Sequence, residues 1–368
     1  MKNLMFIIST LERCGPVNVL YNLIKYLDKD KYNITILTLS PEPENSRFED
    51  FQGLSVKIIT FNLPRNINLI KNVKSLKRVI KEYNPDIIHT HGLRADLIST
   101  LIGNQYKKIS TSHNYPLFDY PLAYGKLKGN LIGYLHLKIF KKIENVIGCS
   151  KTISKQLFLH GIKAISIQNG IDTEKFYSID ENSKKNLRKK LNIPVNKVIY
   201  ISVGSLIKRK NISTVINGFL YSKPQNSTLL IAGEGPLRSE CEKLSKNSKE
   251  IIFLGNVDNV SEYLKCSDYM ISASTAEGLP MAVLESLATG LPVILSDIPP
   301  HSELLEYNKD AGLLFENSYT KLAEKIINIT NDRKSYVDMS NAAISIINKY
   351  LNARLMAKSY EKIYDTIA

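Results

Sequence analysis

The chain has 368 residues, of which 43% are hydrophobic and 23% charged, a composition typical of soluble globular proteins. One hydrophobic core rarely supports more than roughly 250 residues, so we expect two domains. No apolar run approaches the ~20 residues that a membrane-spanning helix requires, which excludes a transmembrane class of protein.

The charge is unevenly distributed. The formal net charge is +14; residues 1–172 carry 24 Lys and Arg against 13 Asp and Glu, a surplus of 11, whereas residues 173–368 carry 25 against 22, a surplus of 3. A basic field attracts nucleic acid or an anionic membrane surface, and charge alone does not distinguish these partners. The four cysteines show neither CxxC pairs nor zinc-like spacing, which indicates structural thiols in a reducing cytosol.

In the first half, short apolar runs alternate with longer stretches of helical period. The runs expected to form strands are Leu4–Ile8, Ile34–Leu39, Val56–Ile59, Asp86–His89, Lys108–Thr111, Val146–Gly148 and Ile165–Gln168. The first run is too short for a signal peptide and continues into Glu12 and Arg13. Strands that alternate with helices predict a parallel α/β sheet.

After a polar stretch from Thr173 to Asn196 the same pattern restarts. The expected strands are Val198–Val203, Thr228–Ala232, Ile251–Leu254, Tyr269–Ser272 and Pro292–Leu295, and helices follow from about Lys321. We therefore predict two facing, doubly wound Rossmann-like domains, 1–172 and 173–350, with 351–368 as a helix that packs back on the first. Such domains bind ligands at the carboxyl ends of their strands, in the cleft between them.

The densest motif lies between two of these strands, in residues 272–297. Pro280 suits the first turn of a helix, where its missing N–H needs no partner, and Gly278 lets the backbone approach a ligand. The free N–H groups of that turn suit an anion such as a diphosphate. Glu285 lies little more than one turn into the helix and leans toward the same place. Because carboxylates repel a diphosphate, we assign ribose hydroxyls to Glu285 and sugar hydroxyls to Glu277.

An isolated pair of glutamates at this spacing would more simply be two solvated side chains beside an amphipathic helix. The string Glu277-Gly278-Leu279-Pro280-Met281, followed by Glu285, however closely resembles the group 1 family of retaining glycosyltransferases with the GT-B fold, glycosyltransferase family four. The resemblance covers nearly the whole chain. The other motifs stand in the family's order: Asn169–Asp172, Val203-Gly204, Lys210-Asn211, Gly233–Pro236, Phe253–Gly255, Asp268 and Asp297–Glu303.

The resemblance implies a set of donor-binding residues. It places Lys210 on the donor diphosphate and the segment Gly278, Leu279, Pro280 and Met281 beside it. The family arginine directly after the glycine is Ser205 here, so Arg209 or Lys208 is expected to compensate.

Two glycine-rich turns belong to the same set. In the first domain the resemblance places Gly15 near the donor phosphates, although the usual pair of glycines is reduced to one. In the second domain Gly233-Glu-Gly235 follows a strand, but Arg238 replaces the third glycine of the dinucleotide fingerprint, which disfavours a nicotinamide site. The family uses this loop as part of the ligand wall.

His113 follows an expected strand, and the resemblance implies an active-site histidine there, close to the transferring sugar. A lone histidine is more often structural. His89 and His91 could join it as metal ligands, but alternate residues of one strand more often pack or line a cleft. Asp28-Lys29-Asp30 matches the D-x-D of metal-dependent sugar transferases, yet it precedes a strand, so we interpret it as a surface turn. We expect no metal and no other cofactor.

The resemblance therefore implies a retaining, metal-independent glycosyltransferase that uses a nucleotide diphosphate sugar, with a UDP-sugar favoured. His113 and Glu277 are the catalytic candidates. A helix N-terminus with Lys210 and Arg209 stabilises the leaving diphosphate, and the leaving phosphate helps to deprotonate an acceptor on the same face of the sugar.

On the acceptor side, basic segments with aromatic residues, Lys71–Tyr83 and Tyr124–Lys142, indicate contact with anionic lipid, with a solvated face as the alternative. We expect a cytoplasmic enzyme, peripheral on the inner face of the cytoplasmic membrane. Its acceptor would be a saccharide, linked to lipid, for a bacterial capsule, O-antigen (lipopolysaccharide) or other surface polysaccharide.

Two alternatives stay open. One is another GT-B-fold enzyme, such as a sugar-nucleotide epimerase or a phosphorylase; the latter would show a lysine environment for pyridoxal phosphate and usually a much longer chain. The other is a basic nucleic-acid-binding protein. The chain shows no helix-turn-helix, RNP or zinc module, so we expect no nucleic-acid partner.

Overall fold

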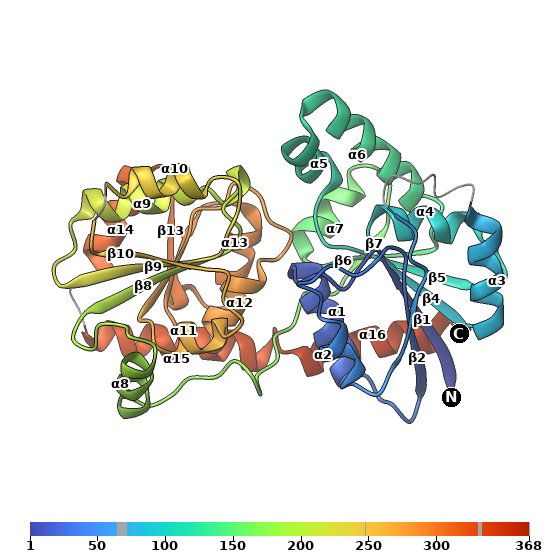
Figure 1. Cartoon of the computed structure of the whole chain (residues 1–368), viewed down its shortest axis with the longest axis horizontal. Coiled ribbons are helices and arrows are strands. Elements are labelled where there is room, and N and C mark those ends of the chain that lie inside the picture. The colour runs from blue at the N-terminus through green and yellow to red at the C-terminus, as the bar shows by residue number, and fades with distance from the viewer. Residues whose placement is uncertain (65–71, 247, 330–332, 368) are drawn as a thin grey trace. The chain divides into compact units, whose positions relative to one another are not determined.

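The computed structural model of the chain describes residues 1–64, 72–246, 248–329 and 333–367. The chain divides into two compact units, Met1–Gly170 with Ala353–Ala368, and Ile171–Asn352 (Figure 1). The boundary between the units, after Gly170, lies two residues before the boundary expected after residue 172. The C-terminal helix belongs to the first unit.

In the described part of the first unit, seven strands form one sheet in the order β3-β2-β1-β4-β5-β6-β7. They are β1 (Lys2–Ile8), β2 (Tyr32–Thr38), β3 (Lys57–Thr60), β4 (Ile87–His91), β5 (Lys107–Ser112), β6 (Asn145–Gly148) and β7 (Ala164–Ser166). All neighbours are parallel, which confirms the predicted α/β class. The strand order reverses between β1 and β4, so the loops after these strands border the ligand-binding crevice of such a sheet.

Helices of the first unit connect these strands, except α16, which follows the second unit in the chain. They are α1 (Gly15–Tyr26), α2 (Phe48–Gln52), α3 (Val73–Tyr83), α4 (Leu93–Leu101), α5 (Pro116–Tyr124), α6 (Lys126–Phe140), α7 (Lys151–Phe158) and α16 (Ala353–Ile367). The core on one face of the sheet joins Ile88 of β4 to Ile80 of α3 and Ile98 of α4, all fully buried. Of the segment Lys71–Tyr83, Lys71 lies outside the described residues.

Two tyrosines fix α16 on this sheet. Tyr360 and Tyr364 are fully buried. The Tyr364 hydroxyl lies 2.7 Å from His89 Nδ1, and the Tyr360 hydroxyl lies 2.9 Å from Thr111 Oγ1. Because a buried hydroxyl without a partner costs stability, these bonds favour one position of the helix.

In the described part of the second unit, six strands form a parallel sheet in the order β10-β9-β8-β11-β12-β13. They are β8 (Val198–Val203), β9 (Ser227–Ala232), β10 (Ile251–Gly255), β11 (Tyr269–Ser272), β12 (Val293–Ser296) and β13 (Gly312–Phe315). The strand β13 was not predicted from the sequence, although β11, which has the same length, was. Gly312 permits its close pairing with β12, since a Cβ there would lie 2.2 Å from the carbonyl oxygen of Val293.

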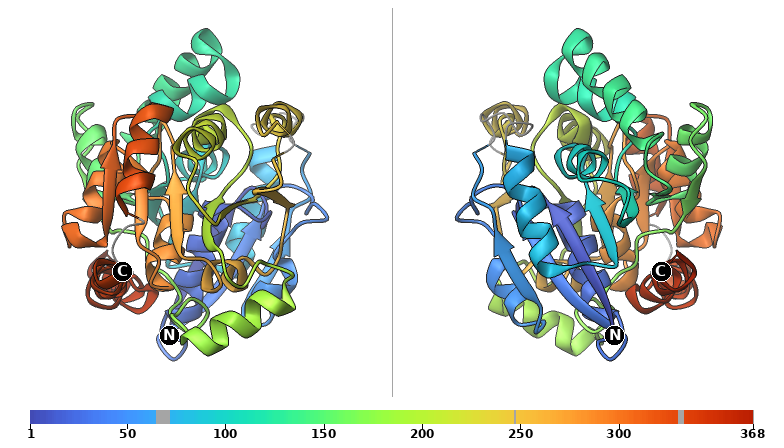
Figure 2. Two further views of the ribbon diagram at one scale, coloured as in Figure 1. Left: turned by 90° about the vertical axis from the view of Figure 1, so that its left-hand side faces the viewer. Right: turned by 90° about the vertical axis from the view of Figure 1, so that its right-hand side faces the viewer.

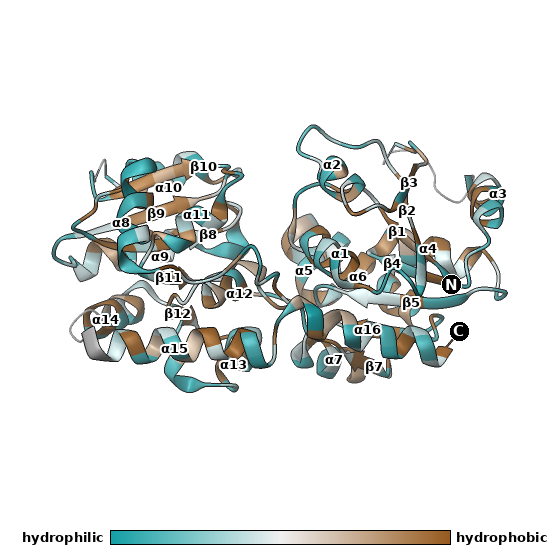
Figure 3. Cartoon of the chain, turned by 90° about the horizontal axis from the view of Figure 1, so that it is seen from below, coloured by the Kyte–Doolittle hydropathy of each residue, from teal (hydrophilic) through white to brown (hydrophobic). Residues whose placement is uncertain are grey.

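Helices cover both faces of this second sheet. They are α8 (Glu181–Lys190), η2 (Lys208–Lys210), α9 (Ile212–Ser222), α10 (Arg238–Leu244), α11 (Val260–Lys265), α12 (Met281–Ala288), α13 (Pro299–Leu305), η3 (Lys309–Ala311), α14 (Tyr319–Ile329) and α15 (Arg333–Lys349). Helices α9, α10 and α14 lie together on one face, and α11, α12 and α15 on the other (Figures 1 and 2). Accordingly β9 is buried along its whole length, and its hydrophobic residues are continuous (Figure 3).

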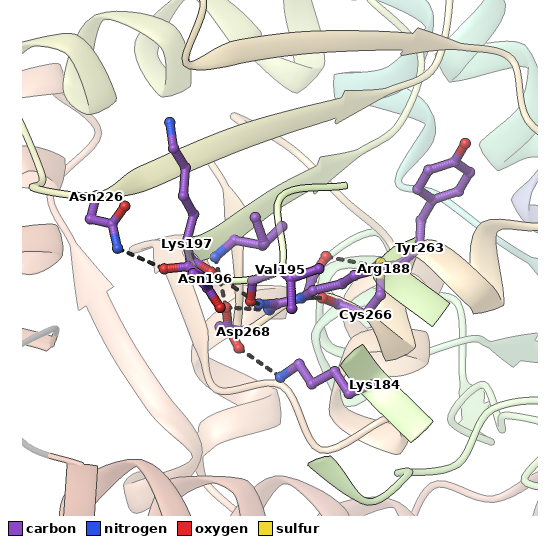
Figure 4. A network of polar contacts seen from close by, with 11 residues as sticks. Lys184, Arg188, Val195, Asn196, Lys197, Asn226, Tyr263, Cys266 and Asp268 are labelled. Carbon is purple, nitrogen blue, oxygen red and sulfur yellow. Dashed lines mark hydrogen bonds and ion pairs between the residues drawn. The ribbon is translucent and has the colours of Figure 1, made fainter. Parts of the chain in front are cut away.

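An ionic network, in which Lys184 and Arg188 are buried and Asp268 is partly buried, ties α8 to this sheet (Figure 4). Asp268, just before β11, accepts hydrogen bonds from Lys184 Nζ at 2.6 Å and Arg188 Nη2 at 2.7 Å. Its Oδ2 also accepts the backbone N–H of Ile199 at 2.7 Å. Asp268 precedes β11 whereas Glu277 follows that strand, so this family residue lies at the opposite end of β11 from Glu277 and has a structural role.

None of the helices that the structure describes is both long enough and apolar enough to span a lipid bilayer.

Candidate active site

The two loops that carry the expected donor-binding residues meet in the second unit. One follows β8 and contains η2; the other follows β11 and contains Glu277. Strands β8 and β11 are neighbours at the point where the strand order of this sheet reverses, which is where open α/β sheets bind ligands. Glu277 accepts hydrogen bonds from Arg209 Nη1 at 2.8 Å, Lys210 Nζ at 2.6 Å and Ser274 Oγ at 2.7 Å.

These contacts fix the charge of Glu277. Its side chain is only 6% exposed. Burial by itself raises the pKa of Glu277, but the charges of Lys210 and Arg209 and the hydrogen bonds of Lys210 and Ser274 outweigh burial and lower the pKa to about 2. Glu277 is therefore ionised at neutral pH and neutralises part of the positive charge of the two cations.

Glycines allow the backbone to approach at this site. Gly204 has a φ of +150°, and a Cβ on it would lie 3.3 Å from the Lys210 side chain. Gly233 of the neighbouring loop packs on the same turn, because its Cβ would lie 2.1 Å from the carbonyl oxygen of Gly204. Gly235 packs in the same way on Leu206. The Gly233-Glu-Gly235 loop thus supports the backbone of the turn that leads to Lys210.

The structure decides which residue joins Lys210. Arg209 contacts both the side chain of Glu277 and the carbonyl oxygen of Ala276, at 2.8 and 2.9 Å. Ser205 and Lys208 are exposed, and the structure does not bring Ser205 into the cluster. Of the two residues expected to compensate for the missing arginine, Arg209 is the one that contacts Glu277.

The segment after Glu277 leads directly into α12. Gly278, Leu279, Pro280 and Met281 are buried. Pro280 caps the helix with a ψ of 110°, and α12 begins at Met281, so the expectation that Pro280 occupies the first turn is wrong by one residue. An extended ψ at Pro280 turns the chain from the loop into the helix. Glu285 is the fifth residue of α12 and is 8% exposed.

A chain of hydrogen bonds behind Glu277 was not visible in the sequence. Ser274 Oγ donates to Glu277, and Ser296 Oγ donates to the Ser274 carbonyl oxygen at 2.6 Å. His301 Nδ1 lies 2.8 Å from the Ser296 carbonyl oxygen. Burial lowers the pKa of His301 to about 4 despite the nearby charge of Glu277. Only the family motif Asp297–Glu303 pointed toward His301, and the two serines lie within the motif 272–297 but were not singled out as site residues.

In the first unit, the predicted site residue His113 lines a cavity. The cavity has a volume of about 270 Å³ and is lined by residues that include Glu12, His91, His113, Asp119, Tyr120 and His136. Cys14 and Pro16, on either side of Gly15, also line it. Gly15 is the first residue of α1, so the predicted glycine turn lies at the edge of this cavity.

His113 is held by a second histidine. His113 Nε2 lies 2.8 Å from His91 Nδ1, and the two rings are stacked with centroids 5.1 Å apart. Burial lowers the pKa of His113 to about 4, although the charge of Asp96 opposes the shift. Burial also lowers the pKa of His91 well below its ordinary value, so both imidazoles are neutral at pH 7, and His113 presents a neutral side chain to the cavity.

The three expected histidines do not share one ligand position. The ring nitrogens of His89 lie 2.7 Å from the Tyr364 hydroxyl and 2.8 Å from Thr111 Oγ1. In the part of the chain that the structure describes, no group of three or more His, Cys, Asp or Glu side chains is arranged to hold a metal ion. Asp28-Lys29-Asp30 lies in the turn between α1 and β2, as interpreted from its position in the sequence.

A polar network in the wall of the cavity was missed by sequence reasoning. Asp96 of α4 is fully buried, and its Oδ2 lies 2.7 Å from His136 Nε2. His136 Nδ1 lies 2.9 Å from the Tyr120 hydroxyl. Ser110 Oγ donates to Asp96 at 2.6 Å. No motif joins residues 96, 120 and 136, which come from three different helices, so the network exists only in the folded chain.

Comparison with known proteins agrees with this arrangement. Two family models match the chain, one described as Glycosyltransferase Family 4 over residues 14–175 and one as Glycosyl transferases group 1 over residues 183–345. The O-antigen biosynthesis glycosyltransferase WclY of Escherichia coli is 29% identical over 371 residues and covers 98% of each chain. The UDP-Gal:alpha-D-GlcNAc-diphosphoundecaprenol alpha-1,3-galactosyltransferase of the same organism is 26% identical over 372 residues, or 95% of this chain and 92% of the relative.

A solved structure shows the same fold. The crystal structure of HepE of Anabaena in complex with UDP-glucose matches with a TM-score of 0.84 and 16% identity, and the match covers 100% of both chains. Two parallel Rossmann-like sheets, one in each matched half, agree with that likeness. The family selects sugar transfer among the alternatives that the sequence left open. The chain belongs to the group 1 glycosyltransferases of family 4 and has the GT-B fold.

Proposed function

We propose that this chain is a retaining glycosyltransferase that moves a sugar from a UDP-sugar to a lipid-linked saccharide during the synthesis of a bacterial surface polysaccharide. The relative WclY is described as an O-antigen biosynthesis enzyme, and the second relative by a UDP-Gal donor and a diphosphoundecaprenol-linked acceptor. The fold neighbour HepE was solved with UDP-glucose. These descriptions support an O-antigen, capsule or similar product.

The observation that carries this proposal is the cluster of Arg209, Lys210 and Glu277. Two cations with one anion leave a net positive charge beside the N-terminus of α12. A diphosphate leaving group gains negative charge as the bond to the sugar breaks, and fixed positive charge stabilises it. We propose that Arg209 and Lys210 hold the diphosphate without a metal ion, while Glu285 binds the ribose hydroxyls and Glu277 a sugar hydroxyl.

We propose the cavity of the first unit for the acceptor saccharide. Its wall offers carboxylates, a tyrosine hydroxyl and imidazoles, the kinds of group that bind sugar hydroxyls. His113 is neutral at pH 7, so its role is to accept or donate a hydrogen bond rather than to add charge. In the retaining route, the leaving phosphate takes the acceptor proton on the same face of the sugar. The enzyme would act in the cytoplasm, peripheral on the inner face of the cytoplasmic membrane.

The test is a thermal-shift screen with UDP, GDP, ADP and their sugar conjugates in the presence of EDTA. A ligand at a hundredfold excess over its Kd stabilises a folded protein by about 2.7 kcal/mol, a shift of several degrees. We expect UDP and one UDP-sugar to raise the Tm, and Glu285→Ala to remove the effect. Glu324→Ala, an exposed glutamate of α14, is the matched control and should respond like the unaltered protein.

Either of two results would contradict the proposed donor site. One is no shift with any nucleotide, and the other is an unchanged shift in Glu285→Ala. If a donor sugar is found, the anomeric configuration of the product, followed by NMR from the start of the reaction, distinguishes retention from inversion.

A further inference from the structure

Helices α5 and α6 expose an unusual amount of apolar surface. They form a hairpin joined at Gly125, and in both views the hairpin projects from the other elements of the first unit (Figures 1 and 2). Leu127 is 91% exposed and Leu131 72% exposed. The other large apolar side chains that the hairpin exposes are Phe118, Leu122, Tyr124, Tyr134 and Leu135. Scattered exposed apolar residues are ordinary on a soluble protein, but a contiguous set marks a contact surface.

The exposed apolar residues of α6 share one side of the helix. Leu127, Leu131, Tyr134 and Leu135 follow the spacing i, i+4, i+7 and i+8, which places them on a single face. The opposite face is buried and includes Gly129, Gly133, His136 and Leu137. The helix therefore has a second apolar face, directed to solvent, in addition to the face that packs on the protein.

Glycines bring α6 so close to α5 that the hairpin behaves as one layer. A Cβ on Gly129 would lie 2.4 Å from backbone atoms of Pro121, and a Cβ on Gly133 would lie 3.0 Å from the carbonyl oxygen of Pro116. The Leu117 side chain of α5 also lies 2.8 Å from the Cβ position of Gly133, so neither glycine leaves room for a side chain of its own. Leu137, Ile139 and Phe140 of α6 are buried, whereas Leu127, Leu131 and Leu135 are exposed to solvent.

Positive charge surrounds this apolar surface. Residues 116–142 contain five lysines, Lys126, Lys128, Lys138, Lys141 and Lys142, and one acidic residue, Asp119. All five lysines are exposed. At 100° per residue, Lys138 falls on the same side of the helix as the exposed leucines, and Lys141 and Lys142 follow at its C-terminal end. Exposed leucines beside lysines match a lipid surface, where apolar side chains enter the headgroup region and ammonium groups pair with anionic lipids.

The hairpin also forms a wall of the cavity in the first unit. Pro116, Asp119 and Tyr120 of α5 and His136 of α6 line that cavity. The cavity and the exposed apolar face thus lie on two sides of the same pair of helices, and a helix with its side chains is only about 10–12 Å thick.

We propose that the α5–α6 hairpin inserts its apolar face into the interface of an anionic lipid bilayer, so that the acceptor cavity lies beside the lipid headgroups. This goes beyond electrostatic contact through basic helices, because the leucines supply the buried apolar area. It deepens the proposed function, on which it rests for the lipid-linked acceptor. A second copy of the chain is a poorer occupant, since a twofold contact would bring the same five lysines against one another.

The chain contains no tryptophan, which permits a direct test with a single reporter. Leu131→Trp places one indole on the proposed face, and Tyr221→Trp places one at an exposed position of α9 in the second unit. Both full-length variants are mixed with phosphatidylcholine vesicles that contain either no phosphatidylglycerol or 30 mol%. We expect the emission of Leu131→Trp to shift to the blue with the anionic vesicles and to be quenched by brominated lipids, and that of Tyr221→Trp to stay unchanged.

Further substitutions in the Leu131→Trp background separate the two contributions. Leu127→Ser with Leu135→Ser should lower the vesicle partition coefficient by about tenfold or more. Lys138→Gln, Lys141→Gln and Lys142→Gln together should lower it by a similar or larger factor on anionic vesicles only, and 0.5 M salt should act in the same way. These exposed positions leave the fold intact, which the UDP thermal shift of each variant verifies.

Two outcomes would overturn the inference. One is an emission of Leu131→Trp that does not respond to vesicles, and the other is a blue shift without vesicles that grows with protein concentration, the sign of self-association. The nucleotide screen separates this inference from the proposed function. Vesicle binding without nucleotide binding would remove the donor chemistry alone, whereas nucleotide binding without vesicle binding would remove the docking surface alone.

Discussion

At the scale of single residues, the charge of the donor site depends on Glu277. Its carboxylate lies 2.6 Å from Lys210 Nζ and 2.8 Å from Arg209 Nη1, so it reduces the attraction of these cations for an incoming diphosphate. The same carboxylate holds both cations in place and, in our proposal, binds a sugar hydroxyl. In this proposal Glu277 lowers the affinity for the nucleotide but helps to orient the sugar.

The variant Glu277→Gln tests this balance, since it keeps the shape of the side chain but removes its charge. We expect the affinity for UDP to rise by roughly tenfold, which corresponds to a binding free energy about 1.4 kcal/mol more favourable. This change is smaller than the interaction energy of ~4 kcal/mol between two unit charges 4 Å apart at an effective dielectric constant of 20. Sugar transfer should nevertheless fall strongly. Isothermal titration calorimetry measures the affinity, and Lys210→Gln should show weaker UDP binding. Weaker UDP binding in Glu277→Gln would contradict this account.

At the scale of elements, the helix α8 is fastened to the second sheet by charge rather than by apolar packing. The sequence of α8 is strongly polar, yet Lys184 and Arg188 are buried. Arg188 also donates to the carbonyl oxygens of Val195, Lys197 and Cys266 (Figure 4). Asp268 supplies the counter-charge for both cations, which explains a family aspartate at the end of β11 opposite the donor-binding loop.

We expect Asp268→Asn to destabilise the second unit by about 3 kcal/mol, because it leaves two buried cations without a counter-charge. The UDP thermal shift should persist in this variant, since Asp268 and Glu277 lie at opposite ends of β11. Urea denaturation measures the loss of stability. Lys190→Gln breaks the exposed ion pair with Glu262 and is the matched control, with little expected effect. A lost UDP response in a folded Asp268→Asn protein would show a role in binding.

At the scale of the whole molecule, the chain returns to the unit in which it began. Helix α16 follows the second unit in sequence but packs in the first, where Tyr364 bonds His89 and Tyr360 bonds Thr111. His89 is fully buried, and burial lowers its pKa to about 3, with a smaller contribution from His113. The contact between α16 and the sheet therefore depends on a neutral imidazole.

This arrangement predicts a dependence of stability on pH. The folded-state pKa of His89 lies below its ordinary value of 6.5, so the unfolded chain binds the proton first as the pH falls. The stabilisation is complete above pH 6.5 and is lost progressively between 6.5 and about 3, by up to ~1.4 kcal/mol per pH unit for one proton. Urea denaturation at pH 7.5, 6.0 and 5.0 checks the sign, and His89→Gln should flatten the slope. Stability that does not fall toward pH 5 would contradict the buried neutral histidine.

Much of this architecture can be predicted from the sequence because strands and loops are local features. The run around Ile231 predicts a buried strand, since strands covered on both faces are mostly apolar. The motif Glu277 to Glu285 is equally local: a loop, a proline and the first turns of a helix lie within nine residues, so their spacing fixes their approximate geometry. The family resemblance then gives these residues their expected roles.

The remaining features were decided by tertiary structure, since sequence periodicity reports how a segment is buried but not which distant segment covers it. Arg209 rather than Lys208 meets Glu277 because the turn after Gly204 directs the Arg209 side chain there. His136 lies in a segment predicted to face lipid, yet packing turns it inward to Asp96, while Leu127 and Leu131 of the same helix remain exposed. The sequence by itself therefore determined the fold class and the donor motif. Only the tertiary structure decided which charges meet, which polar groups line the cavity, and which apolar face stays uncovered, because these depend on contacts between residues far apart in the chain.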